Sequence, residues 1–257
     1  MPASSEVPRT LLRSLGAAAA LAGAETPAAV AQSPREANPE RPTFATHAYG
    51  VAPGYAELEQ GLSARGVASL REETSWDVNL KFGASRHAQV AIFGPLYART
   101  AGGHGIRDLG VAVKLRTALS LRAAAAVVTS VTAPTGSTAR GLGAGRALGA
   151  LTAVLSADLP QAFHIDLNAG PQGIGAGEPH WFLSIGGSRS FGRAGIAVEV
   201  FQFTPGGAGS RLAGVLGAVT LRPVAWVVVD AGGVARTTSA TPDQVFLGVT
   251  TNFGRLF

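Results

Sequence analysis

Apolar and polar residues alternate along most of the chain beyond residue 55. In the segment 108–118, one face carries Leu109, Val111, Val113 and Leu115, and the other carries Asp108, Gly110, Ala112, Lys114 and Arg116. Successive side chains of a β-strand point to opposite faces of the sheet, so this pattern predicts a strand with one apolar face. The segments 75–83 and 162–170 repeat it.

Extending the same pattern along the chain predicts a fold made almost entirely of strands. Twelve segments fit, at 55–65, 75–83, 87–97, 108–118, 121–132, 150–158, 162–170, 180–189, 194–203, 211–221, 224–234 and 245–257. Their length of roughly ten residues suits a tilted strand of a membrane β-barrel. Because 121–132, 211–221 and 224–234 alternate poorly, ten strands is the alternative count.

The predicted connections alternate in length, as in outer-membrane barrels, which have short periplasmic turns and longer outer loops. The long connections are 66–74, 98–107, 133–149, 171–179, 204–210 and 235–244, and the short ones are 84–86, 119–120, 159–161, 190–193 and 222–223. Aromatic residues favour strand ends, where they meet lipid headgroups. The sequence predicts an outer girdle of Trp76, Tyr97, Trp181 and Phe203 and an inner girdle of Phe82, Phe163, Phe191 and Phe257.

Composition agrees with a lipid-facing exterior. Only 14% of residues are charged and 34 are glycine, whereas a soluble domain carries roughly 25% charged residues. Every candidate apolar stretch of helix-spanning length is interrupted, and the other structure that can span a bilayer is a closed barrel. The sequence therefore predicts an all-β, transmembrane, antiparallel up-and-down barrel of about twelve strands, in residues 55–257, with periplasmic termini.

The first 54 residues predict export and a linker. Arg9 and Arg13 precede an apolar run at 15–24, and the small residues before Gln32 suit signal-peptide cleavage after Ala31, with cleavage after Ala24 as the alternative. Residues 1–31 are the predicted signal peptide. Residues 32–54, rich in proline and charge, are predicted to be a flexible periplasmic lead-in. The expected location is the outer membrane of a Gram-negative bacterium.

The last segment alternates and ends on Phe257. It resembles the C-terminal signal that the barrel assembly machinery recognises in outer-membrane proteins, with Phe253 and Phe257 as its aromatic positions. The alternative is a sheet-edge strand that happens to stop at phenylalanine. Outer-membrane lipids and this machinery are the expected partners.

Short motifs also resemble the outer-membrane "transporter" family associated with the meta-pathway of phenol degradation. They are Gly105-Ile106-Arg107-Asp108-Leu109 leading to Lys114, Pro134-Thr135-Gly136, Glu199, Thr241-Pro242-Asp243, Leu247-Gly248 and Phe253. The resemblance covers most of residues 50–257. It implies a barrel that passes small hydrophobic or aromatic solutes, although the longest loop here is rich in Ala, Gly and Arg.

If the apolar faces meet lipid, the opposite faces direct ionisable side chains into the lumen. These candidates are Glu57, Glu59, Asp77, Lys81, Asp108, Lys114, Arg116, His164, Asp166 and Glu199. A charge facing hydrocarbon at mid-membrane would cost about 2–4 kcal/mol, so inward placement is strongly favoured. They form either a constriction that selects solutes or a salt-bridge network that fills the barrel.

The predicted function is an outer-membrane pore or transporter for small solutes, not an enzyme, without metal or other cofactor. Scattered basic residues exclude a nucleic-acid-binding face. One alternative is an outer-membrane lipid hydrolase, although no serine is obviously aimed at His164. Another is a purely structural barrel, and a third is a soluble ligand-binding barrel whose apolar faces would point inward.

Overall fold

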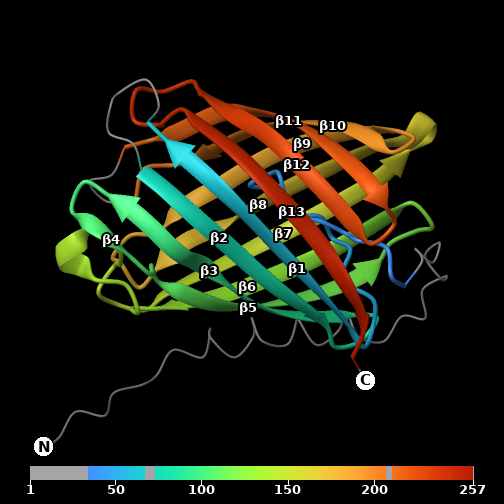
Figure 1. Cartoon of the computed structure of the whole chain (residues 1–257), viewed down its shortest axis with the longest axis horizontal. Helices are drawn as coiled ribbons and strands as arrows, with labels where there is room; N and C mark the ends of the chain where they lie inside the picture. Colours follow the sequence, from blue (N-terminus) through green and yellow to red (C-terminus); the bar gives the residue numbers. More distant parts are fainter. Residues whose placement is uncertain (1–33, 67–72, 207–209, 257) are drawn as a thin grey trace, which may run out of the picture.

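The computed structural model describes residues 34–66, 73–206 and 210–256, which form one closed antiparallel barrel (Figure 1). Its twelve barrel strands are β1 (Tyr55–Arg65), β2 (Glu73–Gly83), β3 (Ala88–Thr100), β5 (Leu109–Ala118), β6 (Ala123–Ala133), β7 (Leu148–Leu159), β8 (Phe163–Ile174), β9 (His180–Phe191), β10 (Ala194–Phe203), β11 (Leu212–Val224), β12 (Val227–Arg236) and β13 (Gln244–Arg255). The short β4 (Gly103–Gly105) pairs with the end of β3. Two 3-10 turns, Thr138–Arg140 and Pro160–Ala162, lie in connections.

Each barrel strand pairs with its neighbours in sequence, and β1 closes the ring by pairing with β13. Closure pairs the backbone donors and acceptors of the edge strands, which is the condition for a sheet to cross a bilayer. The predicted fold class is confirmed, and the count is twelve rather than ten. The three segments that alternate poorly in sequence form the full-length barrel strands β6, β11 and β12.

The apolar faces point outward. On β5, Val111 and Leu115 are each more than half exposed, whereas Lys114 between them is 2% exposed. A soluble barrel would have the opposite arrangement, so the ligand-binding alternative fails on this point. Among the described residues, the structure has no helix with the length and apolar character needed to cross a membrane.

Long and short connections sort to opposite ends, as predicted. Residues 84–87, 119–122, 160–162, 192–193 and 225–226 make the short-turn end. The long-loop end holds 101–108 with β4, 134–147, 175–179 and 237–243, together with the described residues 66, 204–206 and 210–211 of the two other connections. The lumen therefore has a short-turn end and a long-loop end.

The aromatic girdles agree with the prediction in part. Trp76, Tyr97 and Trp181 are exposed at the long-loop end, and Phe163 and Phe191 are exposed at the short-turn end. Phe203 differs, because it turns into the lumen and stacks on Phe182 with ring centroids 4.9 Å apart. Phe257 and the predicted signal peptide lie outside the described residues.

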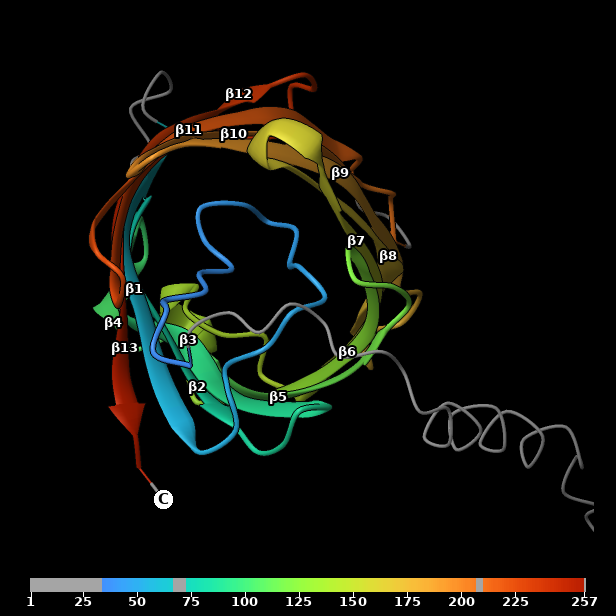
Figure 2. The ribbon, with the colours of Figure 1, turned by 90° about the vertical axis from the view of Figure 1, so that its right-hand side faces the viewer.

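The segment 34–54 lies inside the ring of strands (Figure 2). We call it the plug. It has no regular secondary structure beyond turns, yet Ala37, Ala45, Ala48 and Val51 are buried. This differs from the flexible periplasmic lead-in predicted for 32–54. The proline- and charge-rich composition predicted a solvated linker. The residues that hold the plug in place belong to the barrel wall and are distant in sequence, so no local pattern reveals them.

Candidate functional site: the occupied lumen

The plug enters and leaves the lumen at the short-turn end. Near its start, Ala37 N–H donates to Ala225 O in the β11–β12 turn, at 2.9 Å. At its end, Gly54 N–H donates to Gly83 O at the end of β2, at 2.8 Å. Between these points it reaches Glu199, halfway along β10. The plug therefore occupies the short-turn half of the barrel, where a cavity of about 180 Å³ remains between its residues 39–47 and the wall of β8–β12.

Carboxylates of the wall hold the main chain of the plug. Glu57 accepts Asn38 N–H at 2.7 Å, and Glu59 accepts Glu40 N–H at 2.6 Å. Glu199 accepts two consecutive amides, Phe44 N–H at 2.7 Å and Ala45 N–H at 2.8 Å. All three glutamates are at most 2% exposed. Ionised acceptors make short, strong hydrogen bonds, and here they replace the water that the plug amides lose on burial.

Neutral side chains of the wall continue the same pattern. Asn168 accepts Thr46 N–H at 3.1 Å and returns its own amide to Thr46 O at 2.9 Å. Ser156 accepts Ala48 N–H at 2.7 Å, and Gln89 accepts Val51 N–H at 2.9 Å. These contacts lie on β8, β7 and β3. The plug is thus held around much of the circumference.

Two buried lysines complete the polar lining. Lys81 Nζ lies 2.7 Å from Glu57 and 2.6 Å from Glu59, and it also donates to Asn38 O at 2.9 Å. A buried ammonium is tolerated only when it is paired and hydrogen-bonded in this way. Lys81 therefore connects β2, β1 and the plug in one cluster.

Lys114 binds the plug directly. Its Nζ lies 2.6 Å from Glu40 and donates to Thr46 Oγ1, His47 O and Tyr49 O at 2.8–3.2 Å. Burial alone would raise the pKa of Glu40, but the ammonium of Lys114 holds that pKa well below its usual range. The Glu40 carboxylate therefore stays ionised inside the barrel.

Arg41 occupies a slot made by Gly61, Gly248 and Asp230, which we call the arginine slot. Gly248 pairs with Gly61 on one side and with Asp230 on the other, so the three residues form a row across β1, β13 and β12. The guanidinium donates to Asp230 at 3.3 and 3.4 Å. A Cβ on Gly61 would lie 2.6 Å from Arg41 Cζ, and one on Gly248 would lie 2.5 Å from Arg41 Nε. Only glycine leaves room for the guanidinium here.

Small apolar residues of the wall pack against the side chain of Ala48 in the plug. Ala48 lies against Ala124, Ala126 and Val154, and all four are at most 6% exposed. This contact explains the poor alternation of β6, because its inward face meets protein rather than water. A larger side chain at either β6 alanine would collide with the plug.

The long-loop half of the lumen carries an aromatic cluster on β9–β13. Its buried members are Phe182, Phe201, Leu216, Ala218, Val234 and Phe246, with Phe203 packed against them. Phe44, at the innermost part of the plug, contacts Phe201 with ring centroids 4.5 Å apart. The rings of Phe201 and Phe246 lie over glycines of neighbouring strands. We call this group the aromatic cluster, and it faces the lumen just beyond the plug.

The structure brings five of the predicted site residues together and separates the others. Glu57, Glu59, Lys81, Lys114 and Glu199 all contact the plug. Arg116 places its guanidinium 5.7 Å from the ring of Tyr49. These residues hold a protein segment in the lumen by ion pairs, hydrogen bonds and one cation–ring contact.

Of the remaining predicted residues, Asp77 and Asp108 contact other parts of the barrel, whereas the ring of His164 lies 5.7 Å from that of Tyr49 in the plug. Asp77 accepts from Ser75 at 2.7 Å in the long-loop half. Asp108 is the clearest difference: it precedes β5 at the long-loop end and accepts Gly136 N–H and Ala144 N–H, so it anchors the loop 134–147. His164 and Asp166 contact each other at 3.0 Å.

Sequence reasoning missed the residues whose role depends on the plug. These are Glu40, Arg41, Gln89, Ser156, Asn168 and Asp230. One signal was present, because Asp230 is the single acid in a strand whose other residues, apart from the terminal Arg236, are small or apolar. The other five look like ordinary polar residues of a strand or linker.

The geometry around His164 does not assemble a hydrolase. Its Nδ1 lies 2.7 Å from Asp158 and its Nε2 lies 3.0 Å from Asp166, so both ring nitrogens face carboxylates. The hydroxyl of Ser156 donates to Asp166. A serine nucleophile needs its base within hydrogen-bond reach, and this histidine has no nitrogen directed at that serine. Within the described ranges, no group of three or more metal-ligating side chains comes together.

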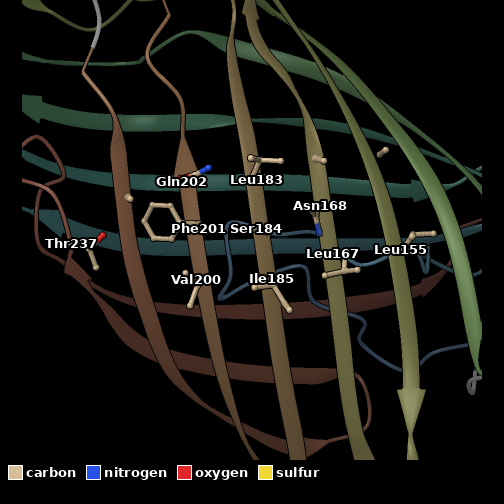
Figure 3. Close-up of a pocket in the computed structure, with 13 residues that line it drawn as sticks. Leu155, Leu167, Asn168, Leu183, Ser184, Ile185, Val200, Phe201, Gln202 and Thr237 are labelled. Carbon is tan, nitrogen blue, oxygen red and sulfur yellow. The ribbon is translucent and has the colours of Figure 1, made fainter.

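A shallow groove of about 500 Å³ lies on the outer surface of the wall, across β7–β11 (Figure 3). Its rim includes Leu155, Leu167, Ile185 and Val200, whose side chains are 45–53% exposed. Ala153 and Ala169, which pair across β7 and β8, make it concave. The groove is apolar and belongs to the outward face, so it is separate from the polar lumen.

Comparison with solved structures places this fold among outer-membrane channels. The COG4313 outer membrane channel from Pseudomonas putida F1 matches 80% of this chain and 98% of its own, with 13% identity and a TM-score of 0.61. KdgM porin matches 77% and 99% at 9% identity and 0.53, and NanC porin matches 76% and 98% at 6% identity and 0.54. No family model matches the chain, and no curated protein matches it. At such identities the likeness shows the fold alone.

Proposed function

We propose that this protein is an outer-membrane channel of a Gram-negative bacterium that passes small hydrophobic or aromatic solutes. The observation that carries the proposal is the aromatic cluster, which lies in the long-loop half of the lumen, beyond the plug. The short-turn end is then periplasmic and the long-loop end extracellular.

The outer surface supports a membrane location. Leucine, valine and isoleucine cover the outward face at 36–61% exposure, including Leu62, Val198 and Leu247. Such a surface on a closed barrel suits hydrocarbon, while charged residues midway along the strands, such as Lys114 and Glu199, point inward. The solved channels and porins with this fold are consistent with that location. Outer-membrane lipids and the barrel assembly machinery are the proposed partners.

The lumen supports the solute class. A pore for hydrophilic solutes is lined by polar side chains, whereas this half of the lumen carries stacked rings on β9 and β10. Aromatic rings bind other rings by offset or edge-to-face contact, worth about 0.5–1.5 kcal/mol beyond the buried area. A flat aromatic solute can therefore replace the contact that Phe44 makes with Phe201. The resemblance to the phenol-degradation family points to the same class of solute.

Binding of a small aromatic probe tests the solute class. Naphthalene is titrated into the purified full chain in detergent and followed by its fluorescence. Phe201→Ala with Phe246→Ala is expected to weaken binding at least tenfold. Phe191→Ala, on the outward face and 50% exposed, is the matched control and should leave the affinity unchanged. Equal binding by all three proteins would refute the aromatic cluster as the solute site.

Conductance in planar bilayers tests the channel itself. The wild-type chain is expected to show small, infrequent openings because the plug occupies most of the periplasmic half. Variants that loosen the plug should open more often. A barrel that stays impermeable to ions and to naphthalene after its plug is loosened would have only a structural role.

A further inference from the structure

We propose that the periplasmic half of the lumen is a binding site for an extended peptide that carries an arginine at the arginine slot. The plug is the copy of this ligand that the chain itself supplies. A free peptide of the same chemistry, arriving from the periplasmic end, would compete with it. This inference concerns peptide binding and holds whether or not the barrel transports aromatic solutes.

The wall recognises the plug mainly through its backbone. Seven plug N–H groups, at positions 38, 40, 44, 45, 46, 48 and 51, donate to six side chains of the wall. Lys81 and Lys114 donate in return to the carbonyls of Asn38, His47 and Tyr49. Any polypeptide offers such amides and carbonyls, so this part of the recognition does not require the plug's own sequence.

The arginine slot supplies the register. Main-chain hydrogen bonds repeat along a peptide and give affinity, whereas a side-chain pocket fixes which residue lies where. Gly61 and Gly248 leave a space that a guanidinium fills, and Asp230, 1% exposed, gives it a carboxylate. The ring of Phe246 lies 5.8 Å from Arg41 Cζ on a further side. The two glycines, the carboxylate and the ring all suit a planar guanidinium, so the slot selects an arginine at this position of the peptide.

The test separates the plug from the barrel after folding. A protease recognition sequence is inserted after Pro53, which is exposed between the plug and β1. The full chain is folded with its plug in place and then cleaved there. A fluorescent synthetic peptide of residues 34–53 is added in excess, and its binding is followed by anisotropy and by block of conductance. An Arg41→Ala peptide and a peptide N-methylated at Phe44 and Ala45 are the comparison ligands.

The proposal predicts that the labelled peptide exchanges with the cleaved plug and restores the low conductance. Loss of the guanidinium, or of the two N–H groups that Glu199 accepts, should each weaken binding at least tenfold. A peptide with the same composition in scrambled order should bind more weakly than the native one. Equal binding of the Arg41→Ala peptide would overturn the role of the slot. Absence of exchange in either direction would overturn the existence of a reversible peptide site.

Discussion

The arginine slot makes a strong prediction about what keeps the plug in place. Replacing Gly248 by alanine puts a methyl group 2.5 Å from Arg41 Nε and 2.7 Å from Asp230 Oδ2. Both distances are shorter than any normal carbon contact. The strand pairs on both sides, with β1 and β12, so the guanidinium is the part that must move.

Expelling the guanidinium leaves Asp230 buried without its cation. Breaking a buried ion pair costs about 3–5 kcal/mol when the remaining charge cannot reach water. The two hydrogen bonds here are long, at 3.3 and 3.4 Å, and the Arg41 side chain is 19% exposed. We therefore expect about 2 kcal/mol, and at 1.4 kcal/mol per factor of ten this shifts the equilibrium toward the displaced plug roughly 30-fold.

Open probability in planar bilayers measures this shift directly. Gly186→Ala is the matched control, because it also faces the lumen but its Cβ would approach no atom closer than 3.9 Å. It should behave like the wild type. In an Arg41→Ala background, Gly248→Ala should add little, since the two changes remove the same interaction. A Gly248→Ala barrel that is as closed as the wild type, or equal effects in both backgrounds, would refute the reasoning.

Three other substitutions test the rest of the structure. Glu199→Gln keeps one acceptor for two plug amides and should raise the open probability about tenfold in the same bilayer assay, whereas an unchanged value would mean that this carboxylate does not hold the plug. Lys81→Met leaves its two glutamate partners buried together without their cation and should lower the stability of the barrel by about 3–5 kcal/mol. The loss is measured as a lower midpoint temperature of the heat-induced change in gel migration. An unchanged midpoint temperature would contradict the buried ion-pair cluster. Val113→Arg, on the outward face of β5, should lower folding stability in lipid vesicles by about 2–4 kcal/mol. Leu119→Arg, in a short turn, is its control and should lower folding stability by at most about 1 kcal/mol. Equal losses of stability would argue against a lipid-facing strand.

The sequence by itself determined the barrel. Alternation fixed which residues of β5 point outward, because the two-residue period of a strand is a local property that no tertiary contact alters. The sorting of long and short connections followed from the same strand boundaries. Even the poorly alternating β6 and β12 matched the predicted ranges to within three residues at each end, although no sequence pattern explained the small residues on their inward faces.

Only the tertiary structure decided what the lumen contains. The arginine slot joins residues 41, 61, 230 and 248, and it exists because β1 closes against β13 in one register. A shift of one residue would turn Gly248 and Asp230 to opposite faces. The plug looks like a linker in sequence because its amides are satisfied by side chains more than a hundred residues away, such as Glu199 and Ser156. Periodicity describes neighbours along the chain, whereas this site depends on contacts that form only when the ring closes.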